Sequence, residues 1–237
     1  MGLMYWQLND IWQGPTWSTI EYNLKWKMSH YYARHMYAPI YIVTSLSPYL
    51  ADIHDSTAEL SVTIINENLN GTEGVLMCGL YNLQSFDPQL MFAGEISMNS
   101  SGQHTMVTYD YSSLMKRAEC ISSSLCILHC VYETGKLFVR QTLFLTRPKN
   151  YVTFDPNLQI HNLTKISSND FTFVLTATRP ALFVWLDIPS TVSGYFSRNG
   201  FHMFQHSIVI SFHSWTPIDT LEIRPVFSLF DITQPSK

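Results

Sequence analysis

The stretch LSVTII at residues 60–65 decides the fold class of this chain. Apolar Leu60, Val62 and Ile64 stand at every second position. Successive side chains of a β-strand point to opposite faces, so this spacing is typical of a strand with one buried face. The sequence therefore predicts a half-buried strand here, and the pattern extends in both directions along the chain.

Short runs of the same kind recur from residue 40 to the C-terminal region. Turn-forming residues separate them, as at residues 133–136 and 198–200. Regularly spaced short strands with such turns are typical of antiparallel sandwiches. A polar, proline-containing break at residues 147–150 divides the runs into two sets, which predicts two β-sandwiches in tandem. The expected strands include residues 75–81, 105–109, 126–132, 137–145, 158–160, 171–175, 182–186, 201–204, 207–212 and 221–227.

The N-terminal part of the chain has a different pattern. Residues 2–12 form a short apolar run that ends in polar and aromatic groups, and an apolar-aromatic stripe at helical spacing begins at Leu24. Pro39 ends the expected helix. A strand, a loop and a helix make one βα unit, and strand ends of this kind carry the ligands in (β/α)₈ barrels. One unit cannot close a barrel, so residues 1–38 are interpreted as part of an active-site floor whose other parts lie outside this sequence.

The composition describes a folded protein with a large buried core. Hydrophobic residues make up 46% of the 237 residues and charged residues only 14%, which excludes disorder. The net charge is −4 and no Lys/Arg cluster occurs, so no nucleic-acid partner is expected. No apolar run approaches the ~20 residues that span a bilayer, and no signal peptide is recognisable at the N-terminus. We therefore expect no membrane partner either.

Three N-glycosylation motifs and four cysteines favour an oxidising, secretory compartment. The motifs begin at Asn70, Asn99 and Asn162, and chance occurrence in a Ser/Thr/Asn-rich chain is the alternative. Cys120 and Cys126 are close enough to close a small disulfide loop. A zinc site is the rival interpretation, but the sequence has no Cys-x₂-Cys pair and its histidines show no metal-ligand spacing. No metal is therefore expected, and the targeting segment is expected to lie outside this sequence.

Two blocks of the sequence resemble a known family. The first reads YWQLNDxWxxPxWSxxEY at residues 5–22 and continues as KWKxxHYYA at residues 25–33. The second reads FVWLD at residues 183–187, then GYFSxNGF and WxP at residues 194–201 and 215–217. In this order and spacing they resemble the lysosomal β-mannosidases of animals, which are glycoside hydrolases with a TIM barrel flanked by β-sandwich domains. Asn23-Leu24 departs from the small residues that are usual there, and the region between the blocks matches only weakly.

The resemblance implies a mainly-β fold class: two tandem immunoglobulin-like β-sandwiches preceded by the last βα unit of a TIM barrel. Only the C-terminal portion of the family's structure is expected in this chain. The implied domains are the terminal βα unit of a (β/α)₈ glycosidase barrel at residues 1–38, an immunoglobulin-like sandwich at 39–149, and the C-terminal sandwich of β-mannosidase type at 150–237.

The resemblance also implies a function for the complete enzyme. It would hydrolyse terminal non-reducing β-D-mannose residues of oligosaccharides in lysosomal glycoprotein N-glycan catabolism, with no cofactor. Retaining hydrolysis needs two carboxyl groups ~5–5.5 Å apart, and the family's two catalytic glutamates lie upstream of Tyr5. Asp10 and Glu21, the carboxylates of residues 1–38, match neither of them. The chain alone is therefore expected to be inactive, with the missing barrel portion as its partner.

The expected substrate-binding residues are Trp6, Asn9, Asp10 and Trp12. By resemblance, Trp6 forms part of the platform beneath the mannose ring, because aromatic faces suit the C–H face of a sugar; packing inside the barrel is the alternative. The other three residues follow in the loop, where they would contact hydroxyls or orient other groups. Loop capping is the alternative for Asn9 and Asp10. Trp185 is expected in the core of the last sandwich.

Two other classes of function remain open at this point. One is a free-standing β-sandwich module for carbohydrate binding or adhesion, which predicts exposed aromatic side chains on one sheet face. The other is a truncated isoform without independent function. That reading predicts aggregation, because the apolar residues 3–5 and the helix after Trp26 would lack a barrel to pack against.

Overall fold

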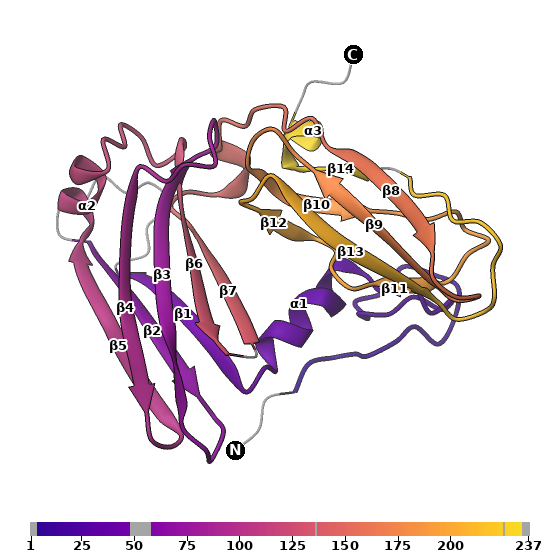
Figure 1. Ribbon diagram of the computed structural model, residues 1–237, viewed down its shortest axis with the longest axis horizontal. Coiled ribbons are helices and arrows are strands. Elements are labelled where there is room, and N and C mark those ends of the chain that lie inside the picture. Colours follow the sequence, from indigo (N-terminus) through magenta and orange to yellow (C-terminus); the bar gives the residue numbers. More distant parts are fainter. Residues whose placement is uncertain (1–3, 48–57, 136, 225, 234–237) are drawn as a thin grey trace. The chain divides into compact units, whose positions relative to one another are not determined.

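The computed structural model describes residues 4–47, 58–135, 137–224 and 226–233, and these form mainly antiparallel β-sheet (Figure 1). The predicted mainly-β class is confirmed. The helices are α1 (Met28–Met36), α2 (Tyr111–Arg117), α3 (Leu229–Thr233) and the 3₁₀ turn η1 (Pro148–Asn150). The strands are β1 (Ile40–Ser47), β2 (Glu59–Asn66), β3 (Thr72–Asn82), β4 (Leu90–Met98), β5 (Gly102–Asp110), β6 (Cys126–Thr134), β7 (Leu137–Phe144), β8 (Gln159–Lys165), β9 (Asp170–Thr176), β10 (Ala181–Leu186), β11 (Gly194–Phe196), β12 (Phe201–Met203), β13 (Ser207–Ser214) and β14 (Val226–Phe227).

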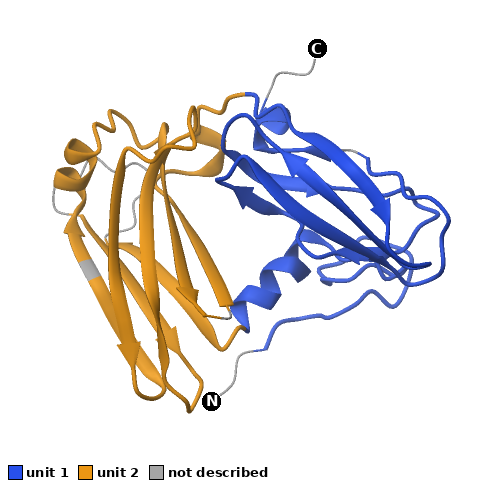
Figure 2. Ribbon diagram, viewed as in Figure 1, with its two compact units in different colours: residues 1–37, 155–237 blue, residues 38–154 orange. Residues whose placement is uncertain are grey.

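The chain divides into two compact units (Figure 2). Unit 1 comprises Met1–Tyr37 together with Asp155–Lys237, and unit 2 comprises Ala38–Phe154. The N-terminal segment thus shares a unit with the last sandwich, although unit 2 separates the two in the sequence. Within the described residues, the helices are too short or too polar to cross a membrane.

Unit 2 is a sandwich of two antiparallel sheets, with strand orders β1-β2-β5 and β4-β3-β6-β7. The alternation at residues 60–65 is confirmed, because Leu60, Val62 and Ile64 are fully buried. The inward positions of the other strands complete one core, in which packed apolar side chains from both sheets meet. Its other large members are Ile42, Leu76, Leu80, Ile96, Leu128 and Tyr132.

Two disulfides fasten unit 2. Cys78 on β3 and Cys130 on β6 stand directly opposite each other in the ladder and are bonded, with a Cα–Cα distance of 4.1 Å. Cys120, after α2, is bonded to Cys126 at the start of β6. The structure thus pairs all four cysteines, one pair across neighbouring strands and one across a short loop.

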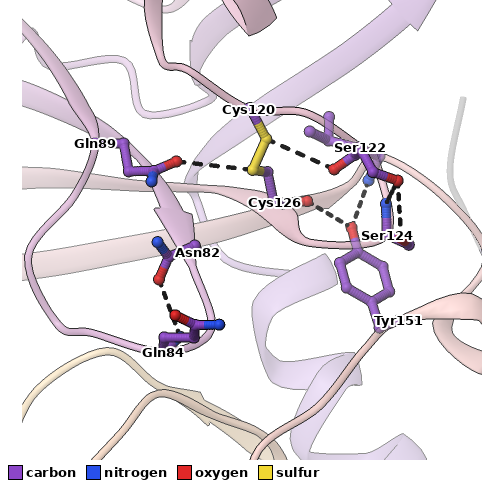
Figure 3. The surroundings of a disulfide bond; sticks show 9 residues. Asn82, Gln84, Gln89, Cys120, Ser122, Ser124, Cys126 and Tyr151 are labelled. Carbon is purple, nitrogen blue, oxygen red and sulfur yellow. Dashed lines mark hydrogen bonds between the residues drawn. A yellow bond between two sulfur atoms is a disulfide. The ribbon is translucent and has the colours of Figure 1, made fainter.

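A buried tyrosine braces the base of the short loop (Figure 3). The Tyr151 hydroxyl accepts a hydrogen bond from the Leu145 amide at 2.8 Å and donates one to the Cys126 carbonyl at 3.1 Å. The sulfur of Cys126 lies 3.9 Å from Oε1 of Gln89. Because a disulfide sulfur carries no hydrogen, this approach is a contact and not a hydrogen bond. Tyr151 therefore joins the end of β7 to the start of β6.

The sandwich of unit 1 has a four-stranded sheet of order β11-β13-β9-β8 and a three-stranded sheet of order β12-β10-β14. Period-two burial on β9 and β13 places Phe171, Phe173, Ile210 and Phe212 in its core. The buried side chain of Asn199 is bonded to β10. Its Oδ1 accepts from the Leu186 amide at 2.7 Å, and its Nδ2 donates to the Leu186 carbonyl at 2.6 Å. The side-chain amide of Asn199 thus bonds to the backbone of β10 in the way that a neighbouring strand would.

The N-terminal segment differs most from expectation. Residues 4–27 form no regular strand and are held by isolated bridges, Asn9 with Ile20 and Ile20 with Trp26. A strand needs a continuous hydrogen-bonded neighbour, and single bridges do not supply one. The helix begins at Met28 and not at Leu24, because Leu24 adopts a φ of +67° that no α-helix accommodates.

Candidate functional site

The aromatic segment, defined as residues 4–27, folds back on itself twice. The Asp10 amide donates to the Ile20 carbonyl at 2.9 Å, and the Ile20 amide donates to the Leu8 carbonyl at 2.9 Å. The Lys27 amide donates to the Thr19 carbonyl at 3.0 Å. Residues 8–10, 19–20 and 26–27 therefore lie side by side. Of the residues expected to contact a sugar, Asn9 and Asp10 belong to the first of these stretches, Trp6 lies just before it and Trp12 just after it.

Asp10 is the buried centre of this arrangement. One carboxylate oxygen, Oδ1, accepts hydrogen bonds from the hydroxyls of Thr16 and of Ser18, the latter at 2.5 Å. The other, Oδ2, lies 3.0 Å from Nζ of Lys27. The Ser18 and Thr16 hydroxyls, together with the Lys27 ammonium, lower the pKa of Asp10 to about 2. The carboxylate is thus ionised and engaged on both oxygens, an arrangement suited to holding the loop in shape.

Trp6 and Trp12 point away from the packed interior, with exposed fractions of 75% and 58%. Asn9 is exposed, and its Nδ2 donates to the carbonyl of Asp10 at 3.1 Å. The ring of Trp12 lies against Gly14, where any Cβ atom would collide with it. Trp17 is also 75% exposed. The four expected site residues therefore share one folded segment, and the indole rings of Trp6, Trp12 and Trp17 are open to solvent.

The opposite side of the segment is fixed to the sandwich of unit 1. Trp26 stacks on Tyr195 with ring centroids 4.4 Å apart and an interplanar angle of 14°. The buried hydroxyl of Tyr31 on α1 accepts from the Phe196 amide at 3.0 Å, and burial raises the pKa of this tyrosine to about 12. Trp185 meets Tyr31 edge to face, with ring centroids 6.2 Å apart. These aromatic residues are structural, and they hold the segment on a rigid support.

Two polar contacts strengthen this support. The indole Nε1 of Trp215 donates to the Leu24 carbonyl at 3.0 Å, and Nζ of Lys25 donates to the Ile188 carbonyl at 2.9 Å. Sequence reasoning treated these residues only as matches to a family pattern. Their partners lie more than 160 positions away along the chain, so local sequence carried no signal for these contacts.

The remaining expected site residues lie on the surface and in unit 2. Asn70 and Asn99 stand on exposed turns of unit 2, and Asn162 stands on the exposed strand β8 of unit 1. The expected partners Cys120 and Cys126 are joined in the structure. Among the described residues, no group of three or more His, Cys, Asp or Glu side chains is arranged to hold a metal ion.

His202 gives unit 1 a dependence of stability on pH. The Phe183 amide donates to Nδ1 of His202 at 3.1 Å, which requires that nitrogen to be unprotonated. Nε2 lies 3.4 Å from the Tyr32 hydroxyl, and burial lowers the histidine pKa from 6.5 to about 4. Between these two values the unfolded chain binds a proton that the folded chain does not.

We expect the titration of His202 to cost unit 1 about 3 kcal/mol of stability as the pH falls from 6.5 to 4. This contribution levels off below pH 4, where protonation of Asp10 begins to destabilise the same unit. Denaturant unfolding at a series of pH values measures this. His202→Asn is the matched variant, because its amide oxygen accepts the same hydrogen bond without titrating. An equally steep decline in His202→Asn would contradict the assignment.

The comparisons with known proteins agree with this architecture. The family model described as the Ig-fold domain of mannosidases matches residues 155–232, which is the sandwich of unit 1. A solved β-D-mannosidase from Dictyoglomus thermophilum superposes with a TM-score of 0.69 at 15% identity, over 94% of this chain and 26% of that one. An exo-chitosanase from Amycolatopsis orientalis gives a TM-score of 0.61 at 17% identity, over 95% and 31%. Unit 1 therefore contains an immunoglobulin-fold domain of the kind found in mannosidases.

Sequence relatives extend the likeness along the whole chain. The β-mannosidase of Mus musculus is 30% identical over 98% of this chain and 26% of its own length. That of Bos taurus is 33% identical over 96% of this chain and 25% of its own length. The chain is thus a homologue of the β-mannosidases, which confirms the resemblance, and it spans about a quarter of the length of these relatives.

Proposed function

We propose that this chain is the C-terminal part of a β-mannosidase, the retaining exo-glycosidase that removes terminal non-reducing β-D-mannose residues. The observation that carries the proposal is the homology over 98% of the chain, which takes in the aromatic segment as well as the sandwiches. The two disulfides suit an oxidising compartment, and with the β-mannosidase relatives they support lysosomal glycoprotein catabolism as the setting.

In this proposal, the aromatic segment is one wall of the mannose site. Trp6 offers a ring face to the sugar, and Trp12 and Asn9 lie at the rim. Asp10 shapes the loop through its bonds to Ser18 and Lys27. The sandwiches at residues 39–149 and 150–237 brace a barrel, and residues 1–38 form the last part of that barrel.

The two carboxyl groups of the reaction come from outside this chain. A general acid must hold a proton near the working pH, and the pKa of Asp10 is lowered to about 2. Both of its oxygens are also occupied by Thr16, Ser18 and Lys27. The chain alone is therefore inactive, and its partner is the barrel portion that holds the two catalytic glutamates.

The size and activity of the native polypeptide test this proposal. An antibody against residues 183–215 is used to blot and precipitate the protein from tissue. We expect a species several times larger than 27.3 kDa that hydrolyses p-nitrophenyl β-D-mannopyranoside, and no hydrolysis by the isolated chain. A single inactive species of 27.3 kDa plus glycan would overturn the proposal in favour of a truncated product or a binding module.

Trp6→Ala in the complete enzyme tests the wall directly. Loss of a sugar-stacking ring removes about 2 kcal/mol of binding energy, so kcat/KM should fall by ~30-fold. Trp17→Ala is the matched control, because Trp17 is equally exposed on the same segment. We expect the control to change kcat/KM by less than about 3-fold. Equal losses in both variants would contradict a specific role for Trp6.

A further inference from the structure

The four-stranded sheet of unit 1 ends in an open edge at β8. Among the residues that the structure describes, this strand pairs with β9 alone, and the other edge strand, β11, is three residues long. Apart from Ile160, the residues of β8 are exposed. A free strand edge presents unpaired amides and carbonyls and is a template for pairing with another chain. β8 is therefore the strand edge of unit 1 that is most open to pairing with another chain.

A bulge in β8 displays an asparagine at this edge. His161 pairs with Val174 and Thr164 pairs with Thr172, so that Asn162 and Leu163 both stand opposite Phe173. Asn162 adopts a φ of +55°, a conformation that asparagine tolerates better than most residues. Its side chain is exposed, and its carbonyl accepts from Oγ1 of Thr164 at 3.1 Å.

The edge has few of the usual protections against pairing. Lys165 is the one Lys, Arg, Asp or Glu of β8, and its Nζ lies 3.3 Å from Oδ1 of Asp219. Two apolar side chains are open to solvent in and just after the strand, Leu163 at 41% and Ile166 at 64%. The bulge disturbs the ladder but leaves these apolar groups uncovered.

We propose that Asn162 carries an N-linked glycan and that this glycan covers the free edge of β8. Asn162-Leu163-Thr164 is an acceptor motif, and the paired cysteines indicate the oxidising compartment in which such transfer takes place. Nδ2 of Asn162 forms a bond to the anomeric carbon of a lipid-diphosphate-linked oligosaccharide. The bond from that carbon to the phosphate oxygen breaks, the lipid diphosphate leaves, and the amide loses one proton.

The proposal stands on unit 1 alone and does not depend on mannosidase activity. The other two motifs are in a different setting, because Asn70 and Asn99 lie on adjoining turns of unit 2. Asn66 joins those turns, since its Nδ2 donates to the Asn70 carbonyl at 3.0 Å and to the Ser100 carbonyl at 3.2 Å. They offer glycan acceptors in the other unit and serve as internal comparisons.

Occupancy is tested on the full chain secreted from animal cells. Glycopeptide mapping should find the peptide that contains Asn162 glycosylated. Thr164→Ala and Asn162→Gly should each remove that glycan, and glycine tolerates the positive φ of the bulge. Thr164→Ser keeps both the acceptor motif and the hydroxyl, so it should keep the glycan. An unmodified Asn162 peptide in the wild-type chain would overturn the proposal.

Association tests the role of the glycan. Light scattering over a range of concentrations should show more self-association in Thr164→Ala and Asn162→Gly than in the wild-type chain or Thr164→Ser. Leu163→Lys added to Thr164→Ala should reverse the increase, because an edge lysine opposes strand pairing. Unchanged association in the two unglycosylated variants would overturn the covering role.

Discussion

Asn199→Ala is expected to destabilise unit 1 by about 3 kcal/mol, because it leaves a buried amide and a buried carbonyl of Leu186 without their present partners. Asn199 is itself 4% exposed, so water does not readily replace the lost amide. Denaturant unfolding of the full chain measures the effect as a lower midpoint for the transition of unit 1.

Two further variants make this result specific. Asn199→Asp keeps the acceptor for the Leu186 amide but sets a carboxylate oxygen against the Leu186 carbonyl, so a loss of similar size is expected. Asn169→Ala removes a hydrogen bond at 2.8 Å to the Ser214 carbonyl and an exposed one from the Ser168 hydroxyl. Its side chain is less buried than that of Asn199, so the loss should be about 1 kcal/mol. If Asn169→Ala lowered the stability of unit 1 as much as Asn199→Ala, the explanation by two hydrogen bonds between Asn199 and β10 would be wrong.

Removing the disulfide between Cys78 and Cys130 by paired alanine substitutions should destabilise unit 2 by about 4 kcal/mol. The two cysteines are 52 residues apart, and closing so long a loop removes much entropy from the unfolded chain. Unfolding under non-reducing conditions measures the loss, and the transition of unit 1 should not move.

The second disulfide provides the matched control. Cys120 and Cys126 are 6 residues apart, and the same relation between loop length and entropy gives about 2 kcal/mol for their removal. Both double variants replace buried sulfur by the same smaller side chain, so the difference between them reports loop length. A larger loss from the short loop than from the long one would refute this explanation.

Strands with one buried face could be predicted from the sequence alone. The expected runs at 126–132 and 207–212 correspond to β6 and β13. Burial alternates along β13, whereas residues 126–130 of β6 form one continuous buried run. β4 was missed. Its buried pattern is weak, and among the residues of the strand only Ile96 is fully enclosed. Of the described residues in the expected strand at 221–227, Val226 and Phe227 are in a ladder with β10.

Pairings between distant residues could not be predicted in this way. The bond between Cys78 and Cys130 depends on the register of β3 against β6, which many residues set together. The pairing of Cys120 with Cys126 could be predicted without the strand register, because the two residues are close in the sequence. For the same reason, the packing of Tyr31 and Trp26 on the last sandwich could not be predicted from local patterns.

The residue types located the candidate site in the sequence, but the exposure and the bonding partners of these residues are known only from the structure. An aromatic and polar run indicated a ligand-handling loop, and Trp6 and Trp12 are indeed open to solvent. Whether Asp10 would face a sugar or the loop depended on Ser18 and Lys27, which reach it only after the segment folds back. The proposed wall of the mannose site therefore rests on a buried ion pair that sequence patterns do not show.

The placement of both chain ends in unit 1 has a mechanical consequence. Tension applied between residues 4 and 233 passes first through the contacts that join the aromatic segment and α1 to the last sandwich, such as the hydrogen bond between Tyr31 and Phe196. Unit 2 is attached to unit 1 at both of its own ends, so it bears no load until those contacts part. A stretched molecule should therefore unfold in a fixed order, unit 1 first and unit 2 second. The disulfide between Cys78 and Cys130 should then shorten the extension that accompanies the unfolding of unit 2.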